Sequence, residues 1–171
     1  AEVSATPIPV MKLAGTIIGT AGSYNNEGNT ITKVFDNDLN SFFDANVANG
    51  AWAGLDFGAG VSNIITQIKY CPRAGGFANR MPGGVFQGAN QANFSGAVTL
   101  FTITTQPPSG AFTSVNIANA TAFRYVRYLS PNNSWGNVAE VEFWGSSAAT
   151  PSAPTGLAAI ASDAQVALSW S

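Results

Sequence analysis

The 171-residue sequence contains no histidine and a single cysteine, Cys71. Without histidine, the chain lacks the Ser-His and Cys-His pairs and the His-based zinc or copper centres that many enzymes use. One cysteine cannot form a disulfide within the chain, and the apolar context of Cys71 in "IITQIKYC" favours a small core residue over a nucleophile. The sequence therefore favours a function that needs neither imidazole nor thiol chemistry.

Charged residues are also scarce. They make up 9% of the chain, and seven basic against nine acidic residues give a net charge of −2. The scattered basic residues produce no positive field that would attract nucleic acid or an anionic membrane. The longest apolar runs are far shorter than the roughly 18 residues that a membrane-spanning helix needs. We therefore expect neither nucleic acid nor an anionic membrane as a partner.

Short β-strand patterns are common, whereas helical periodicity is rare because glycine or proline usually intervenes. The candidate strands are rich in β-branched and aromatic residues and are bounded by Gly, Asn, Pro and Ser. They are KLAGTIIGT, AWAGLDFG, NIITQIKYCP, GAVTLFTIT, FTSVNIA, AFRYVRYLS and VAEVEFWG. In AFRYVRYLS, alternation puts Phe123, Tyr125, Arg127 and Leu129 on one face and Arg124, Val126 and Tyr128 on the other. Large groups on both faces predict a central strand of an all-β sandwich.

The segment 73–94, RAGGFANRMPGGVFQGANQANF, is rich in glycine and amide side chains. This composition predicts a long ordered loop, and such a loop in a compact domain is more often functional than idle.

A domain boundary is expected after "EFWG". Residues 1–145 form the main domain, residues 146–154 read as a Ser/Ala/Pro linker, and residues 155–171 show two alternating strand patterns. This tail resembles the first two strands of a fibronectin type III domain, which would bury Trp170. The resemblance implies a longer modular protein, in which the main domain is covalently linked to further modules. A start such as "AEVSATP" is also natural after removal of a signal peptide.

The cluster KVFDNDLNSFFD, residues 33–44, holds three aspartates and two asparagines. Together with three other stretches it resembles the F5/8 type C (discoidin) family, whose bacterial members include carbohydrate-binding modules similar to family 32. The other stretches are AWAGLDFG, IKYCPRAGGFANRMPGG, and FRYVRY continuing to NVAEVEFWG. The match covers roughly residues 12 to 145 in the order that the family shows.

The resemblance implies a jelly-roll β-sandwich of the galactose-binding type with about eight main strands, and a structural calcium ion. Calcium accepts carbonyl oxygens as readily as carboxylates, which suits a tight acidic turn. The implied ligands are the Lys33 carbonyl, the Asp36 carboxylate, the Asp38 carbonyl, the Ser41 carbonyl or hydroxyl, the Ala139 carbonyl and the Glu140 carboxylate. Two positions depart from the family pattern, since Asn37 replaces a usual Gly and Ser41 a usual Thr. The alternative is an ordinary Asx turn with solvated carboxylates.

Sugar binding combines aromatic rings, which pack on the C–H faces of a sugar, with Arg and Asn side chains that bind its hydroxyls. The resemblance assigns ligand contact to Arg73 and Asn79. Arg80 follows Asn79 directly because the family's intervening Gly is missing. Loop composition adds Phe77, Trp135, Asn132 and Asn133. As alternatives, Phe77 anchors its loop, Trp135 covers the core, and Arg73 pairs with Glu142 or a backbone carbonyl. Trp52 is expected in the core.

No catalytic role is expected, because glycosidases need two acids across a cleft and Asp56 and Glu142 fall within strands. Asp44 is the other acid that the calcium assignment leaves over. The sequence thus predicts a noncatalytic carbohydrate-binding module that binds a galactose-type sugar or a plant or bacterial polysaccharide. We expect it to be secreted or on the surface of a bacterial cell. The alternatives are an adhesion domain for protein or lipid, and an accessory domain packed on a catalytic partner.

Overall fold

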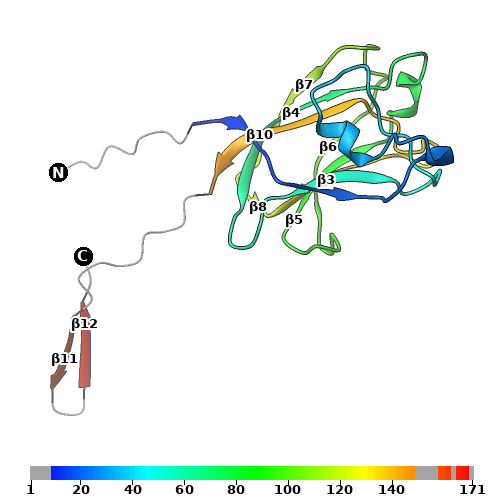
Figure 1. The fold of residues 1–171 in the computed structure, drawn as a ribbon. Helices are drawn as coiled ribbons and strands as arrows, with labels where there is room; N and C mark the ends of the chain where they lie inside the picture. The colour runs from blue at the N-terminus through cyan, green and yellow to red at the C-terminus, as the bar shows by residue number, and fades with distance from the viewer. Residues whose placement is uncertain (1–8, 149–157, 163–164, 170–171) are drawn as a thin grey trace.

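The computed structural model describes residues 9–148, 158–162 and 165–169, and its main part is a sandwich of two antiparallel sheets (Figure 1). The first sheet has the order β1-β10-β4-β7, with β8 paired to β4. Its strands are β1 (Met11–Lys12), β10 (Glu140–Ser147), β4 (Asn63–Cys71), β7 (Thr113–Asn116) and β8 (Ala122–Phe123). The second sheet has the order β2-β3-β9-β5-β6. Its strands are β2 (Thr16–Gly19), β3 (Trp52–Asp56), β9 (Tyr125–Leu129), β5 (Val85–Ala89) and β6 (Val98–Thr102). The predicted all-β sandwich is confirmed.

Side chains from both sheets meet in one hydrophobic core. Phe86 of β5 lies edge-on to Phe143 of β10, with ring centroids 6.1 Å apart, and its ring is 5.2 Å from that of Tyr128. All three side chains are fully buried. Each such side chain stabilises the fold by roughly 1.5–3 kcal/mol relative to an exposed one.

The longest strand pairing joins the middle of the chain to the end of the domain. β10 and β4 pair from Glu140 opposite Cys71 to Ser147 opposite Asn63. This register brings Glu140 to the same end of the sandwich as the loop that follows Cys71. Cys71 is a free, fully buried residue, as the sequence predicted. Burial, with a contribution from the Glu140 carboxylate, raises the pKa of its thiol.

The prediction of a loop over residues 73–94 is wrong in the second half of this segment. It contains a short 3-10 helix, η3 (Ala78–Arg80), and the strand β5, which lies between β9 and β6 in the second sheet. The sequence does not reveal β5 because the glycines in and before it are typical of turns. A Cβ on Gly88 would lie 2.5 Å from the ring of Phe123, so this glycine serves close packing and not a turn.

Two predicted strands divide between the sheets. In AFRYVRYLS, Ala122–Phe123 pair with β4 and Tyr125–Leu129 form the central strand β9, so the predicted alternation fails at Arg124. Phe123 consequently lies in the main core and Tyr125 in a second cluster with Trp52 and Phe94. KLAGTIIGT likewise splits into β1 and β2. Trp52 is partly buried in this second cluster on the outer side of the sheet.

The C-terminal part holds a separate antiparallel pair, β11 (Ala158–Ser162) with β12 (Gln165–Ser169). β10 extends through Ser147, two residues into the predicted linker. Residues 149–157 and Trp170 lie outside the described residues. Within the described part of the chain, no helix is both long and apolar enough to cross a bilayer.

Candidate carbohydrate-binding pocket

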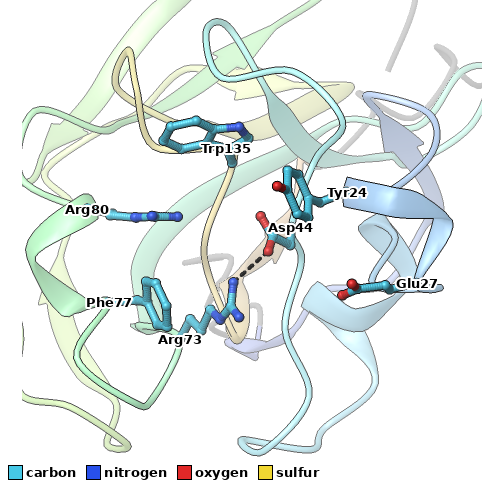
Figure 2. A pocket seen from close by; sticks show the side chains of 7 residues that line it. All are labelled: Tyr24, Glu27, Asp44, Arg73, Phe77, Arg80 and Trp135. Atoms are coloured by element: carbon cyan, nitrogen blue, oxygen red, sulfur yellow. Dashed lines mark hydrogen bonds and ion pairs between the residues drawn. The ribbon is translucent and has the colours of Figure 1, made fainter.

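A pocket of about 320 Å³ opens at the end of the sandwich where β4 ends and β10 begins. Figure 2 shows the side chains that line it, which are Tyr24, Glu27, Asp44, Arg73, Phe77, Arg80 and Trp135. Tyr24 belongs to the 3-10 helix η1 (Tyr24–Asn26), and Glu27 caps that helix. Arg73, Phe77 and Arg80 come from the loop after β4, and Trp135 from the β9–β10 connection. The volume lies at the small end of the range for ligand pockets and suits one or two sugar rings.

A short ion pair forms the floor of the pocket. Nη1 of Arg73 donates to Oδ2 of Asp44 at 2.6 Å, and both side chains are mostly buried. The backbone of Asp44 is also fixed, because its carbonyl accepts the Tyr24 N–H and its N–H donates to the Asn29 carbonyl. The expected alternative partner of Arg73, Glu142, instead pairs with Lys12 and Lys69.

The two arginines of the pocket interleave with aromatic rings. The Arg73 guanidinium lies 3.7 Å from the ring centroid of Phe42 and 4.1 Å from that of Phe77. The Arg80 guanidinium lies 4.7 Å from the centroid of Phe77 and 4.8 Å from that of Trp135. Figure 2 shows Arg80 between Trp135 and Phe77. Cation–π contacts of this kind fix the planes of both guanidinium groups.

Asn137 lies behind the pocket and has no exposed surface. Its Oδ1 accepts hydrogen bonds from Arg80 at 2.8 Å and from Arg73 at 3.2 Å. Its Nδ2 donates to Oδ1 of Asp44 at 2.8 Å. One buried amide therefore connects three of the four charged side chains that line the pocket.

Trp135 occupies a strained turn. Its φ is +52°, a left-handed conformation that is rare for a bulky side chain, and Asn133 and Gly136 on either side also have positive φ. The Trp135 carbonyl accepts the Ala45 N–H at 2.7 Å, so the turn is held against the segment that carries Asp44. Strain that is held in place in this way is frequent at ligand-binding sites.

Four of the predicted sugar-binding residues, Arg73, Phe77, Arg80 and Trp135, line this pocket. Asn79, Asn132 and Asn133 are exposed and do not line it. The sequence prediction missed Tyr24, Glu27 and Asp44 as pocket residues, and Asn137 behind them. Asp44 carried a signal, because it is an acid next to the aromatic pair of the acidic cluster. Tyr24 and Glu27 lie among Asn and Gly residues, and nothing in that stretch of sequence indicates a binding site.

The three acids that the sequence analysis weighed for catalysis, Asp44, Asp56 and Glu142, each form a separate ion pair. Asp44 pairs with Arg73, Asp56 with Arg124 at 2.8 Å, and Glu142 with Lys12 at 3.0 Å. Asp56 and Glu142 do not line the pocket.

The acidic turn lies beside Glu140. The Ser41 hydroxyl is 2.9 Å from both carboxylate oxygens of Asp36 and 3.3 Å from the Lys33 carbonyl, and the Asp38 carbonyl accepts the Ser41 N–H. The Asp36 carboxyl is close enough to Glu140 to change its pKa. Glu140 opens β10, and the N–H of Ala139, the residue before it, donates to the Cys71 carbonyl.

The surroundings of Glu140 indicate whether the site formed by the acidic turn and β10 fits a cation. Its side chain is fully buried, and neither carboxylate oxygen has a hydrogen-bond partner in the described part of the chain. Burial first, and then the Asp36 carboxyl, raise the pKa of Glu140 to about 7, although the nearby Asn37 N–H and the Lys12 charge act to lower it. Partial burial acts to raise the pKa of Asp36, but the Asp38 N–H and the Ser41 hydroxyl lower it overall. A buried carboxylate without a partner costs several kcal/mol unless a cation or donor satisfies it, so the residues fit calcium.

Among the described residues, no group of three or more His, Cys, Asp or Glu side chains is placed to hold a metal. The two carboxylates of Asp36 and Glu140 would therefore need backbone carbonyls and a hydroxyl to complete a calcium shell, which calcium accepts.

No protein-family model and no curated protein matches the chain. Among solved structures, the chain is similar to CBM62 of Xyl5A from Clostridium thermocellum. The two share 64% identity with a TM-score of 0.80, over 81% of this chain and 99% of the other.

Two more distant structures share the fold. A family 32 module from Clostridium perfringens, solved in complex with GalNAc-β-1,3-galactose, is 15% identical, with a TM-score of 0.58 over 74% of this chain and 94% of the other. A fucolectin from striped bass (Morone saxatilis) is 20% identical, with a TM-score of 0.65 over 77% and 45%. At these identities the likeness is one of fold. The expected discoidin-like sandwich is thus confirmed, while the high identity points to family 62 and not to family 32.

Proposed function

Because the chain belongs to carbohydrate-binding module family 62, and so is a noncatalytic sugar-binding module, we propose that the pocket between Arg73, Arg80 and Trp135 is its sugar-binding site. One observation carries this proposal: the pocket combines aromatic walls with fixed guanidinium donors and a carboxylate acceptor. A sugar ring can pack its C–H face on Trp135 or Tyr24. Its hydroxyls can accept hydrogen bonds from the arginines and donate to Asp44.

We propose a galactose-type sugar, free or at the end of a polysaccharide branch, as the ligand. The family 32 module of similar fold was solved with a galactose-containing disaccharide, which supports this choice. Asn79, Asn132 and Asn133, which are exposed, are proposed to contact further parts of a larger glycan.

Isothermal titration of the calcium-loaded protein with methyl β-D-galactoside tests the site. We expect Trp135→Ala and Arg73→Ala to weaken binding at least tenfold, because each removes a wall or a donor of the pocket. Trp144→Ala is the matched control. Trp144 lies on β10 outside the pocket, where its indole N–H donates to Glu142, so this variant should bind as the wild type does. Equal losses in both tryptophan variants, or no loss in either, would place the sugar elsewhere.

We also propose a structural calcium ion. Lys33, Asp36, Asp38, Ser41, Ala139 and Glu140 would hold it through the oxygens named above. A bound ion would neutralise the buried Glu140 carboxylate and tie the beginning of the domain to its last strand. The unpartnered oxygens of Glu140 support this proposal.

The wider setting is a proposal as well. Plant cell-wall and bacterial surface polysaccharides lie outside cells, which supports an extracellular location, either secreted or at a bacterial surface. The β11–β12 pair is compatible with a fibronectin type III domain beginning at residue 155, linked to the sugar-binding domain. Detection of the native protein in culture medium tests the extracellular location. A structure of the full-length protein tests whether a fibronectin type III domain begins at residue 155.

A further inference from the structure

Four charged side chains line the pocket, two positive and two negative. Arg73 is neutralised by Asp44 at 2.6 Å. Arg80 has no carboxylate within ion-pair distance among residues 9–148, since its guanidinium packs on Phe77 and Trp135 and donates to the amide of Asn137. A ligand that enters the pocket therefore meets the Arg80 guanidinium, which no carboxylate in direct contact neutralises.

Glu27 carries the remaining negative charge. Its carboxylate has no hydrogen-bond or ion-pair partner within the described ranges, and Figure 2 shows it extending into the pocket from the wall opposite Phe77 and Arg80. The backbone fixes its place, because the Glu27 N–H donates to the Tyr24 carbonyl and the next N–H, of Gly28, donates to the Ser23 hydroxyl. With Glu27 ionised, the formal charges of the pocket sum to zero.

We propose that Glu27 determines the charge selectivity of the pocket, making it favour neutral sugars over uronic acids. This inference rests on the proposed sugar site. A neutral sugar uses both walls at once, because a hydroxyl can accept from Arg80 while another donates to Glu27. A uronic acid brings a carboxylate that Arg80 attracts and Glu27 repels. The two effects oppose each other, so the negative charge adds no net affinity. Selectivity here comes from the repulsive group as much as from the attractive one.

Glu27→Gln tests the inference, since the amide keeps an acceptor and removes only the charge. The pocket then carries a net charge of +1, and the affinity for a uronic acid relative to its neutral counterpart should rise about three- to tenfold at low salt. The effect should shrink at high salt, where screening is strong. Arg80→Gln should change the same ratio in the opposite direction. Asp56→Asn, which removes one negative charge away from the pocket, is the control and should leave the ratio unchanged.

Titration calorimetry or NMR titration would compare three pairs of probes: galactose with galacturonic acid, glucose with glucuronic acid, and mannose with mannuronic acid. A rise of the acid-to-neutral ratio in Glu27→Gln alone supports the inference. An unchanged ratio in a variant that still binds galactose overturns the role of Glu27 and leaves the proposed site intact. An equal rise in Asp56→Asn would assign the effect to net charge and also overturn it. If the wild type binds none of the neutral sugars, the proposed function fails, and this inference fails with it.

Discussion

Asn137 shows how a residue that never meets the ligand can set the shape of the site. It is fully buried and contacts Asp44, Arg73 and Arg80 through a single amide. Removing it would take one hydrogen bond from each of the three charged groups, and the loss at Asp44, the buried one, costs about 1–3 kcal/mol.

We therefore expect Asn137→Ala to weaken sugar binding at least tenfold and to lower the free energy of unfolding by about 1–3 kcal/mol. Calorimetric titration and urea unfolding measure the two effects. Asn116→Ala is the control, because Asn116 is an exposed residue that binds only the Gln67 side chain on the outer face of the first sheet. In an Arg80→Ala background, Asn137→Ala should weaken binding much less. Fully additive losses would contradict a role through the arginines.

Gly136 makes a second residue-scale prediction. Its φ is +72°, and a Cβ there would lie 2.5 Å from Cε1 of the buried Phe43 ring. Gly136→Ala should destabilise the protein by about 1–3 kcal/mol or more. It should also weaken sugar binding, because the neighbouring Trp135 turn must move. Gly110→Ala isolates the contact, since Gly110 has a φ of +71° but open space around its Cβ position. Thermal unfolding that is equally affected in both variants would attribute the loss to backbone strain alone.

At this scale, the sequence predicted the residues whose chemistry is evident in a loop, such as Arg73 and Trp135. It did not predict Glu27 or Asn137. Glu27 becomes a pocket residue only because η1 folds against the segment of Asp44, and the role of Asn137 depends on burial. Neither property is local in the sequence.

At the scale of elements, most strands follow from their own residues, and the errors have packing causes. The sequence predicts a loop where β5 lies because Gly84 and Gly88 are typical of turns. Their Cβ positions would instead overlap the Tyr128 and Phe123 rings, so tight packing explains both glycines. The division of AFRYVRYLS between two sheets also depends on partners, because only the pairing of Ala122–Phe123 with β4 separates them from β9.

The ion pair between β3 and the start of β9 gives an element-scale prediction. Arg124 donates two hydrogen bonds to Asp56, at 2.8 and 2.9 Å, and this contact lowers the pKa of Asp56 below its ordinary value of 3.8. A carboxylate with a lowered pKa stabilises the fold above its unfolded-state pKa and loses that contribution as the pH falls through its folded-state pKa. The stability difference between wild type and Asp56→Asn should therefore be largest near neutral pH and should shrink below about pH 4.

Urea unfolding of both proteins between pH 2.5 and 7 measures this difference. Arg124→Gln should show the same trend, because it removes the other half of the pair. A difference that stays constant across the range would mean that Asp56 stabilises the fold by the hydrogen bond that its Oδ1 accepts from the Gly58 N–H and not by its ion pair.

At the scale of the whole molecule, the discoidin-like sandwich was predictable because several weak motifs occur in one order along the chain. The module family was not, since modules of families 62 and 32 share this fold.

Calcium is the whole-molecule prediction. Adding the ion at about 100 times its dissociation constant should raise the free energy of unfolding by about 2.7 kcal/mol, and a chelator should remove this gain. Thermal unfolding with calcium, with magnesium and with EDTA measures it, and Glu140→Gln should abolish the response. Glu142→Gln, two residues further along β10 and paired with lysines, should keep it. A melting temperature that ignores calcium in the wild type would rule the ion out.

The interleaved arrangement of Phe42, Arg73, Phe77, Arg80 and Trp135 has a consequence for how the module meets its ligand. Each of these five side chains is already held by a neighbouring ring or guanidinium, so docking against them costs little rotamer freedom and requires no lid to close. The binding site is preorganised. Crystals of the protein grown with and without a monosaccharide should superimpose closely at these side chains.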